Sequence, residues 1–250
     1  MKNFRLVILD YALKQKEKPA AQKLLNDLIF IKQSNFERTD PDYVVMDKHD
    51  MIGTHFLIFE TSDIYSPRLI YGTRVTYSSR AKNHKIKTPL QDLHPYLSTE
   101  AQTELSEFTV RNPELIEVNS LFVEDGLSAR KSNMHFSDIG FAMIYLHLAR
   151  MGLGHFAGCA NEKYKAHRLV KEIGFLKNNR GYLFDHPVVR FPHMLVMIEK
   201  FNVDYLNGVI QKHLNLFENM MDVSPAELNL QSIPEIVNYS LQSGELQRFG

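Results

Sequence analysis

One stretch of this sequence constrains the fold more than any other: the apolar run Leu115–Val123 carries a single carboxylate, Glu117. Apolar residues on both faces of a strand predict burial on both sides, so this strand belongs in the centre of a sheet. Alternation along the strand would place Asn119 and Leu121 on the same face as Glu117. Desolvation there raises a carboxylate pKa towards neutrality, which a general base for an ammonium nucleophile requires. The alternative is a structural glutamate paired with a nearby cation such as Arg74.

Length and charge exclude several classes of function. A chain of 250 residues can bury a full core, and we expect one elaborated domain. The 29 basic residues balance 29 acidic ones, so no global field favours nucleic acid or an anionic membrane. The single cysteine, Cys159, is expected to be inert core, and the scattered histidines predict no metal site. The N-terminus lacks the apolar core of a signal peptide and no run could span a bilayer, so cytoplasm is the expected compartment.

The hydrophobic pattern predicts an α/β chain with a mixed sheet. We expect strands at 4–10, 54–60, 68–77, 115–123, 155–160, 181–184 and 193–198, the second and third forming a hairpin. Helices are expected from Pro19 onwards, at 99–108 within an irregular insertion of residues 78–112, and at 137–150, 161–173 and 203–221. Ser137 is the expected cap of the third of these helices. Two capping-box spacings, from Ser224 and Ser232, predict further helices in the tail 222–250.

Several short motifs occur together along the chain in a recognisable order. They are Lys32…Phe36, Asp47…Asp50, Gly72-Thr73-Arg74, Glu117-Val118-Asn119-Ser120, and Asn161 before a helix that ends at Gly174-Phe175. In element order and in these motifs the chain resembles the Gcn5-related N-acyltransferase (GNAT) superfamily over roughly residues 4–200. Within it the first half is similar to the acyl-homoserine-lactone synthases and long-chain N-acyl amino acid synthases.

The sequence departs from that pattern at identifiable positions. Lys32 stands where an Arg is usual, and Asn119-Ser120 where Ser-Arg is expected, which argues against S-adenosylmethionine as substrate. Of the Gly-rich pyrophosphate loop only Gly140 remains, and Val170 stands where a Tyr acid is frequent.

The resemblance implies a GNAT-like mixed, mostly antiparallel sheet flanked by helices over residues 1–202. The helical pattern and the capping-box starts beyond it predict a helical C-terminal extension over 203–250 packed on that domain. It also implies an N-acyltransferase that moves an acyl group from acyl-CoA or an acyl carrier protein to the amine of an amino-acid-like acceptor, without a metal. Two alternatives stay open: an acyl-homoserine-lactone synthase that uses S-adenosylmethionine, and a catalytically silent module that binds an acyl carrier. A homodimer is possible in each case.

The same resemblance assigns roles to individual residues. It makes Glu117 the base, with Asn119 beside it. It places the acceptor on Lys32, Phe36, Asp47, Asp50 and Arg74, although Lys32 could instead extend past the helix end, and Arg74 could simply pair with the two aspartates. It places the acyl donor on the strand residues Leu121, Phe122 and Val123, on the basic loop residues Arg130 and Lys131, and on Gly140 and Asn161. For the basic loop, the free N–H groups of the following helix would add to the attraction for phosphate.

Overall fold

The computed structural model describes residues 3–36, 47–63, 67–124, 134–162, 166–188 and 191–224. Its strands are β1 (Phe4–Asp10), β2 (Thr54–Glu60), β3 (Arg68–Tyr77), β4 (Ile116–Val123), β5 (Phe156–Asn161), β6 (Gly174–Leu176), β7 (Tyr182–Asp185), β8 (Pro192–Phe201) and β9 (Met221–Val223). They form one mixed sheet in the order β6-β8-β5-β4-β3-β2-β1-β9, and β7 also pairs with β8. The pairs β4–β5 and β1–β9 are parallel, while the remaining neighbours are antiparallel. The predicted mixed sheet with β4 near its centre is therefore confirmed.

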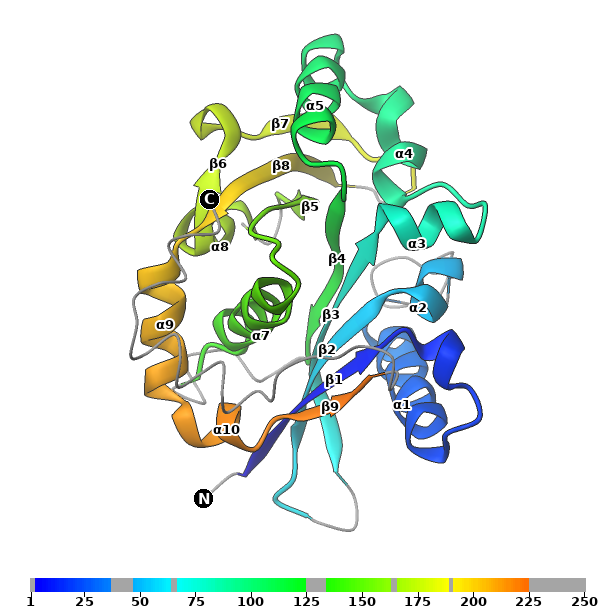
Figure 1. Cartoon of the computed structure of the whole chain (residues 1–250), viewed down its shortest axis with the longest axis vertical. Helices are drawn as coiled ribbons and strands as arrows, with labels where there is room; N and C mark the ends of the chain where they lie inside the picture. Colours follow the sequence, from blue (N-terminus) through cyan, green and yellow to red (C-terminus); the bar gives the residue numbers. More distant parts are fainter. Residues whose placement is uncertain are drawn as a thin grey trace.

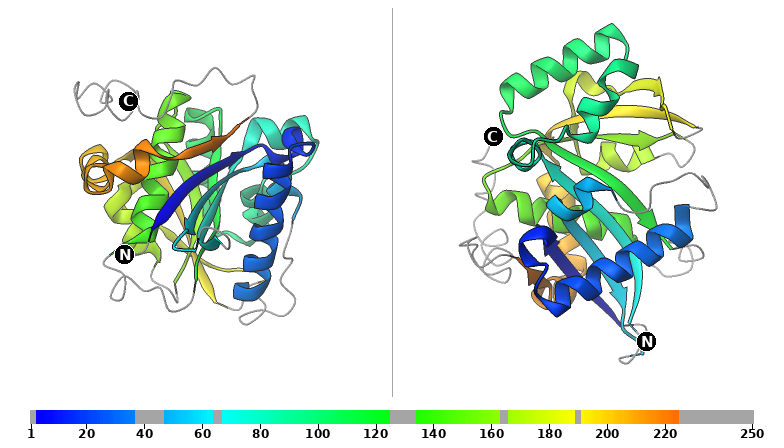
Figure 2. Two further views of the ribbon diagram at one scale, coloured as in Figure 1. Left: turned by 90° about the horizontal axis from the view of Figure 1, so that it is seen from below. Right: turned by 90° about the vertical axis from the view of Figure 1, so that its right-hand side faces the viewer.

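Helices cover both faces of this sheet. They are η1 (Ala12–Gln15), α1 (Pro19–Phe36), α2 (Lys48–Ile52), α3 (Ser78–Asn83), α4 (Pro89–Leu93), η2 (His94–Tyr96), α5 (Thr99–Arg111), α7 (Phe136–Arg150), α8 (Ala166–Ile173), η3 (Lys177–Asn179), α9 (Val203–Lys212) and α10 (Leu214–Glu218). Figures 1 and 2 show α1 on one side of the sheet, with α7, α8 and α9 on the other. The described helices include none with the length and hydropathy needed to cross a membrane.

The α7 face carries the largest apolar core. Residues 139–148 of α7 are buried all round, as expected for a helix enclosed between a sheet and further helices. Next to it, α9 and α10 contribute Leu206, Ile210 and Phe217 to the same core, so this part of the predicted C-terminal extension packs on the domain. The sheet contributes alternate residues of its central strands, among them Leu6, Ile8, Phe56, Ile58, Val75, Ile116, Val118 and Phe156.

The opposite face, which we call the α1 face, has two separate apolar clusters. One joins α1 to strands β1, β2 and β3 through residues such as Leu28, Val7 and Leu57. The other joins α4 and α5 to strands β5, β7 and β8 through residues that include Leu90, Phe108 and Leu195. The buried polar residues of β3 and β4 lie between them, and they form the candidate site.

Several element boundaries differ from the sequence-based predictions. Ser137 does not cap α7, because the helix begins one residue earlier, after His135. The predicted helix at 203–221 is two helices separated at His213, which has a non-helical backbone. The last residue of that predicted helix, Met221, instead begins β9, which pairs in parallel with β1. Met221 is therefore not part of the amphipathic helix. Asn161 ends β5 and does not start a helix.

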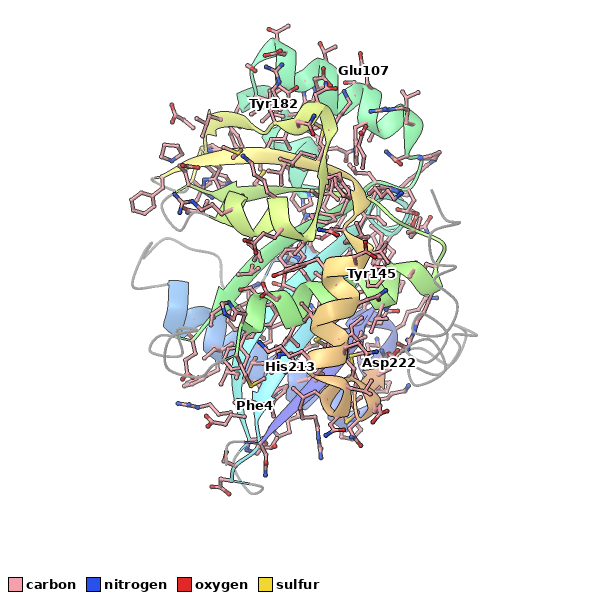
Figure 3. The ribbon with its side chains drawn as sticks, turned by 90° about the vertical axis from the view of Figure 1, so that its left-hand side faces the viewer. Phe4, Glu107, Tyr145, Tyr182, His213 and Asp222 are labelled. Carbon is pink, nitrogen blue, oxygen red and sulfur yellow. The ribbon has the colours of Figure 1, made fainter. Side chains whose placement is uncertain are left out.

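The tail is only partly described. Asp222 and Val223 belong to β9 and not to a helix, and Asp222 pairs with Arg150 of α7 at 2.9 Å. The stretch 225–250, with the capping-box start at Ser232, lies outside the described residues. Figure 3 shows Asp222 on the side of the molecule where α9 packs, close to the end of α7.

Candidate active site

A buried network of charged side chains lies on the α1 face, where α1 and α2 meet β3. The ammonium of Lys32, on α1, donates to both carboxylate oxygens of Asp50 at 2.9 and 2.8 Å. Arg74, on β3, donates from Nη1 to Asp50 Oδ1 at 2.8 Å and to Asp47 Oδ1 at 2.7 Å. Its Nε donates to Asn119 Oδ1, on β4, at 2.7 Å. Lys32, Asp50 and Arg74 are each no more than 2% exposed.

Local geometry explains why Asp47 and Asp50 point into this network. Asp47 caps α2 by accepting from the backbone N–H groups of His49 and Asp50. In return Asp50 accepts from the Asp47 backbone N–H, which completes a capping box. The pair therefore fixes both the start of α2 and the position of the carboxylates beneath Arg74.

The charges in this network balance one another. Burial alone would raise the pKa of Asp50, but the charges of Arg74 and Lys32 outweigh it and hold the pKa well below its ordinary value. Both oxygens of Asp50 already accept hydrogen bonds from cations. The pairing of Arg74 with the two aspartates agrees with the structural alternative of the sequence analysis. Lys32 does not extend past the helix end, because it is fully buried.

Glu117 lies on the same face of β4, two residues before Asn119, but its environment differs from that of the ion network. It is 1% exposed, and one oxygen, Oε2, accepts from the Leu90 backbone N–H at 2.9 Å. Its other oxygen, Oε1, has no hydrogen-bond partner among the described residues. Burial raises the pKa of Glu117 to about 7, although hydrogen bonds from Thr88 and Leu90 act in the opposite direction. The structure shows no ion pair of Glu117 within its described ranges.

The middle of β4 contains a bulge that changes which residues share this face. The β3–β4 register shifts by one residue between Gly72 and Arg74, and Ser120 has a left-handed φ of 53°. Beyond the bulge, Phe122 packs in the α1 cluster and Leu121 is 36% exposed. The predicted shared face of Glu117 and Leu121 is therefore wrong, because an extra residue in the strand inverts the alternation.

Strands β4 and β5 separate after Val118, the residue that follows Glu117. Their parallel pairing is confined to Glu117 with Ala157 and Val118 with Gly158. A side chain on Gly158 would meet the Val118 carbonyl oxygen at 2.5 Å, so glycine permits the close approach of the two strands there. From Asn119 to Val123, in the described part of the chain, the β5 side of β4 has no strand partner. The strand that carries the candidate base thus opens one residue beyond the base.

The residues predicted to bind the acyl donor are more scattered. Leu121, Phe122 and Val123 lie on the open part of β4. Gly140 is in the second turn of α7, where a Cβ would collide with the Tyr71 hydroxyl, so close packing favours glycine there. Asn161 is at the end of β5. Arg130 and Lys131 lie outside the described residues, and so does the side chain of Phe36 at the end of α1.

Two components of the site were not predicted from the sequence. The first is α4, which lies over Glu117 and which the sequence analysis left within an irregular insertion. Its signal is present, since Thr88 caps the helix, Pro89 occupies the first turn and Gln91 completes a capping box. The second is His55, a buried residue of β2 whose Nε2 lies 2.7 Å from the Asp50 carbonyl oxygen. Burial lowers the pKa of His55 to about 4, so its ring is neutral.

Comparison with known proteins identifies the fold. Among solved structures the chain is similar to a CoA-dependent acyl-homoserine lactone synthase, BjaI, with SAM and isopentyl-CoA, at a TM-score of 0.58 and 10% identity over 94% of this chain and 99% of that one. MesI, another CoA-dependent acyl-homoserine lactone synthase, aligns at 0.51 and 10% identity, covering 84% of this chain and 95% of its own. LasI, also an AHL synthase, aligns at 0.50 and 13% identity, covering 83% and 96%.

These similarities show a GNAT-like fold of the kind found in acyl-homoserine lactone synthases. No protein-family model matches the sequence, and no similar sequence is found among curated proteins. What the protein does therefore has to be argued from its own residues.

Proposed function

We propose that this protein is an N-acyltransferase that moves an acyl group from a thioester to the amine of an amino-acid-like acceptor, with Glu117 as general base. The observation that carries the proposal is the state of Glu117: buried, with one oxygen unpartnered among the described residues, next to the point where β4 and β5 separate. The fold it shares with acyl-homoserine lactone synthases supports acyl transfer as the reaction class.

The raised pKa suits the first step of such a reaction. A carboxylate with a pKa of about 7 is partly ionised at neutral pH and is a stronger base than an ordinary glutamate. It would take a proton from the ammonium form of the acceptor, directly or through one water. The neutral amine nitrogen would then attack the thioester carbonyl carbon, and collapse of the tetrahedral intermediate would form the amide and release the thiol. No covalent enzyme intermediate is needed.

The open edge of β4 supports the donor side of the proposal. Along Asn119 to Val123 the backbone has no strand partner on the side of β5 in the described structure. Backbone groups there can hydrogen-bond the amide arm of a coenzyme A or carrier-protein thioester. N–H groups near Leu121 to Val123 would stabilise the oxyanion of the tetrahedral intermediate. The donor is proposed to be either acyl-CoA or an acyl carrier protein.

The buried ion network fixes the position of β4, the strand that carries both Glu117 and the proposed donor-binding edge. Asn119 holds Arg74 Nε from the position two residues after Glu117. We therefore assign Asn119 a positioning role in β4, and Lys32, Asp50 and Arg74 a structural one. A direct contact of Asp47 with the acceptor stays a prediction, since its side chain is 35% exposed and so accessible.

The test is mass spectrometry of lipids from cells that express the protein, beside cells that express Glu117→Gln. New acyl amino acids that disappear with Glu117→Gln support the proposal. Acyl lactones would indicate an S-adenosylmethionine-dependent synthase instead. A lipid profile that matches empty-vector cells would favour a silent module that only binds an acyl carrier, and would contradict the proposed activity.

A further inference from the structure

Positive charge is concentrated in two segments of this neutral chain. Residues 78–91, which form α3 and the start of α4, contain four cations and no carboxylate. Residues 11–20, which include η1, contain three lysines and one glutamate. The whole chain has 29 basic and 29 acidic residues, so the remainder has 22 basic and 28 acidic ones. The charge of the molecule is therefore unevenly distributed, although its sum is zero.

The fold brings the two basic segments side by side. The Tyr11 hydroxyl, just before η1, lies 2.6 Å from His84 Nε2 at the end of α3. Arg80 of α3 donates from Nη1 to Asp10 Oδ1 at 2.8 Å, and its guanidinium lies 4.7 Å from the centre of the Tyr11 ring. Asp10 is completely buried, so these contacts fix the segments relative to each other. Figure 1 shows α3, α2 and η1 one below another along the right-hand side of the molecule.

Several lysines of this surface are exposed and do not take part in holding the fold together. We call the surface the basic face and define it by Lys16, Lys82, Lys85 and Lys87, which are all exposed. Within the described part of the chain these four side chains have no ion pair. The buried Lys32, in contrast, faces the carboxylate of Asp50. The charges of the basic face are therefore available to a partner.

Lys85 occupies a backbone position that favours glycine. Its φ is 55°, in the left-handed region, and it directly follows His84, the last residue of the α3 cap. The Ile86 N–H donates to the Ala81 carbonyl oxygen at 3.0 Å, and the Lys85 N–H donates to the Lys82 carbonyl oxygen at 3.0 Å. In this type of helix end, the Schellman motif, glycine is the usual residue at the left-handed position. The helix end alone therefore does not explain a lysine there, whereas a role for its charge does.

The composition of the basic face favours a lipid surface over a protein or a nucleic acid. The large apolar side chains that are exposed in the described structure all lie outside residues 11–20 and 78–91. A stable protein interface needs a buried apolar or aromatic centre, and single-stranded nucleic acid is bound on exposed aromatic rings. Lysine ammonium groups on flexible side chains need neither, because each is attracted to an anionic membrane as a separate charge.

We propose that the basic face docks this protein on a membrane surface that contains anionic lipids. In the docked state the ammonium groups lie among the lipid phosphates, and the more acidic remainder of the chain faces away from them. The helix that covers Glu117, α4, begins two residues after Lys87 and is then next to the lipid. The proposal goes beyond the acyltransferase function and does not depend on the reaction of Glu117.

Docking is measured by cosedimentation of the full chain with vesicles. Vesicles of phosphatidylcholine and phosphatidylglycerol are the anionic probe, and vesicles of phosphatidylcholine alone are the neutral one. At physiological ionic strength we expect binding to the anionic vesicles only, and release in high salt, because salt screens exposed charges. The triple variant Lys82→Gln, Lys85→Gln and Lys87→Gln should lower the partition coefficient on the order of 100-fold, from the loss of three lysines near an anionic surface.

A second triple variant is the matched control. Lys171→Gln, Lys200→Gln and Lys212→Gln remove the same charge from exposed positions on α8, β8 and α9, and this protein should bind like the wild type. Equal losses in the two triple variants would show a response to net charge and would overturn the basic face. No binding to anionic vesicles, or equal binding to neutral ones, would also contradict docking. Equal or tighter binding to duplex DNA or polyglutamate at the same salt would overturn the assignment to lipid.

Discussion

The polar residues on the α1 face fall into two regions that differ in how charge is compensated. In the ion network, Lys32, Asp50 and Arg74 are buried together and each cation faces a carboxylate. Glu117 is equally buried, but the groups that hydrogen-bond it are neutral, the Leu90 backbone N–H and the Thr88 side chain, and it has no ion pair in the described structure. Compensated charges make a rigid frame, whereas an uncompensated carboxylate keeps a raised pKa and can exchange a proton. Similar burial thus produces a scaffold in one region and a candidate base in the other.

The largest effect is expected on catalysis. Glu117→Gln keeps the volume and the acceptor for the Leu90 N–H but removes the base, so kcat should fall roughly 10³-fold. The measurement is turnover of the acyl amino acid identified in expressing cells, with folding checked by circular dichroism. A variant that retains the wild-type kcat would show that Glu117 is not the base. Glu117 would then have a structural role only, like the ion network.

The ion network should respond in stability. Asp50→Asn removes the carboxylate that faces two buried cations, so the free energy of unfolding should fall by about 3–5 kcal/mol. Asp47→Asn is the control, because this side chain is partly exposed and asparagine caps a helix about as well as aspartate; loss of its pair with Arg74 should cost about 1 kcal/mol. Chemical denaturation of both variants measures the difference. Equal costs for the two substitutions would show that burial does not distinguish these aspartates.

The contribution of Glu117 to the free energy of unfolding should decrease as pH rises, which is the opposite of an ion-paired carboxylate with a lowered pKa. Its pKa is about 7 when folded and 4.5 when unperturbed, so between these values the unfolded chain binds fewer protons than the folded one. Stability is therefore lost as pH rises through this window, by at most about 3 kcal/mol. Glu117→Gln lacks this loss, so its advantage over the wild type should grow from pH 5 to pH 8. A constant difference between the two proteins would contradict a raised pKa.

The smallest effect is expected at the edge of the sheet. Arg150 is 3% exposed and pairs with Asp222 of β9. Asp222→Asn weakens that pair and should lower the free energy of unfolding by about 1.5 kcal/mol. Deletion of residues 222–250 should lower the melting temperature by several degrees, since it also removes the pairing of residues 222 and 223 with β1. Unchanged melting after the deletion would show that this part of the chain is dispensable.

The sequence predicted the strands well because their alternation is local. The hairpin of β2 and β3 and the central β4 follow from patterns within a few residues of each other. The pairing of Arg74 with Asp47 and Asp50 joins positions 27 and 24 residues apart, and the sequence offered it as one of two alternatives. The bulge at Ser120 was not predictable in this way, since nothing in an apolar run indicates an extra residue. For the same reason the prediction that Leu121 shares a face with Glu117 was wrong.

Long-range contacts account for what the sequence analysis missed in the site. Glu117 is separated from Leu90 by 27 positions, so the role of α4 as its cover depends on folding and not on a motif. The cap formed by Thr88 predicts a helix start but not what the helix covers. Likewise the pairing of Met221 with β1 is a long-range contact that the amphipathic pattern of residues 203–221 does not contain.

The pKa of Glu117 is the most direct test of its proposed role as the base, because a raised pKa is what distinguishes Glu117 from the carboxylates of the ion network. With ¹³C-labelled glutamate, the side-chain carboxyl signal of Glu117 is assigned by its absence in Glu117→Gln and followed by NMR as pH is changed. The expected titration midpoint of Glu117 is near pH 7. A midpoint at or below the ordinary glutamate value of about 4.3 would show that the carboxylate is compensated after all, and would contradict its role as the base.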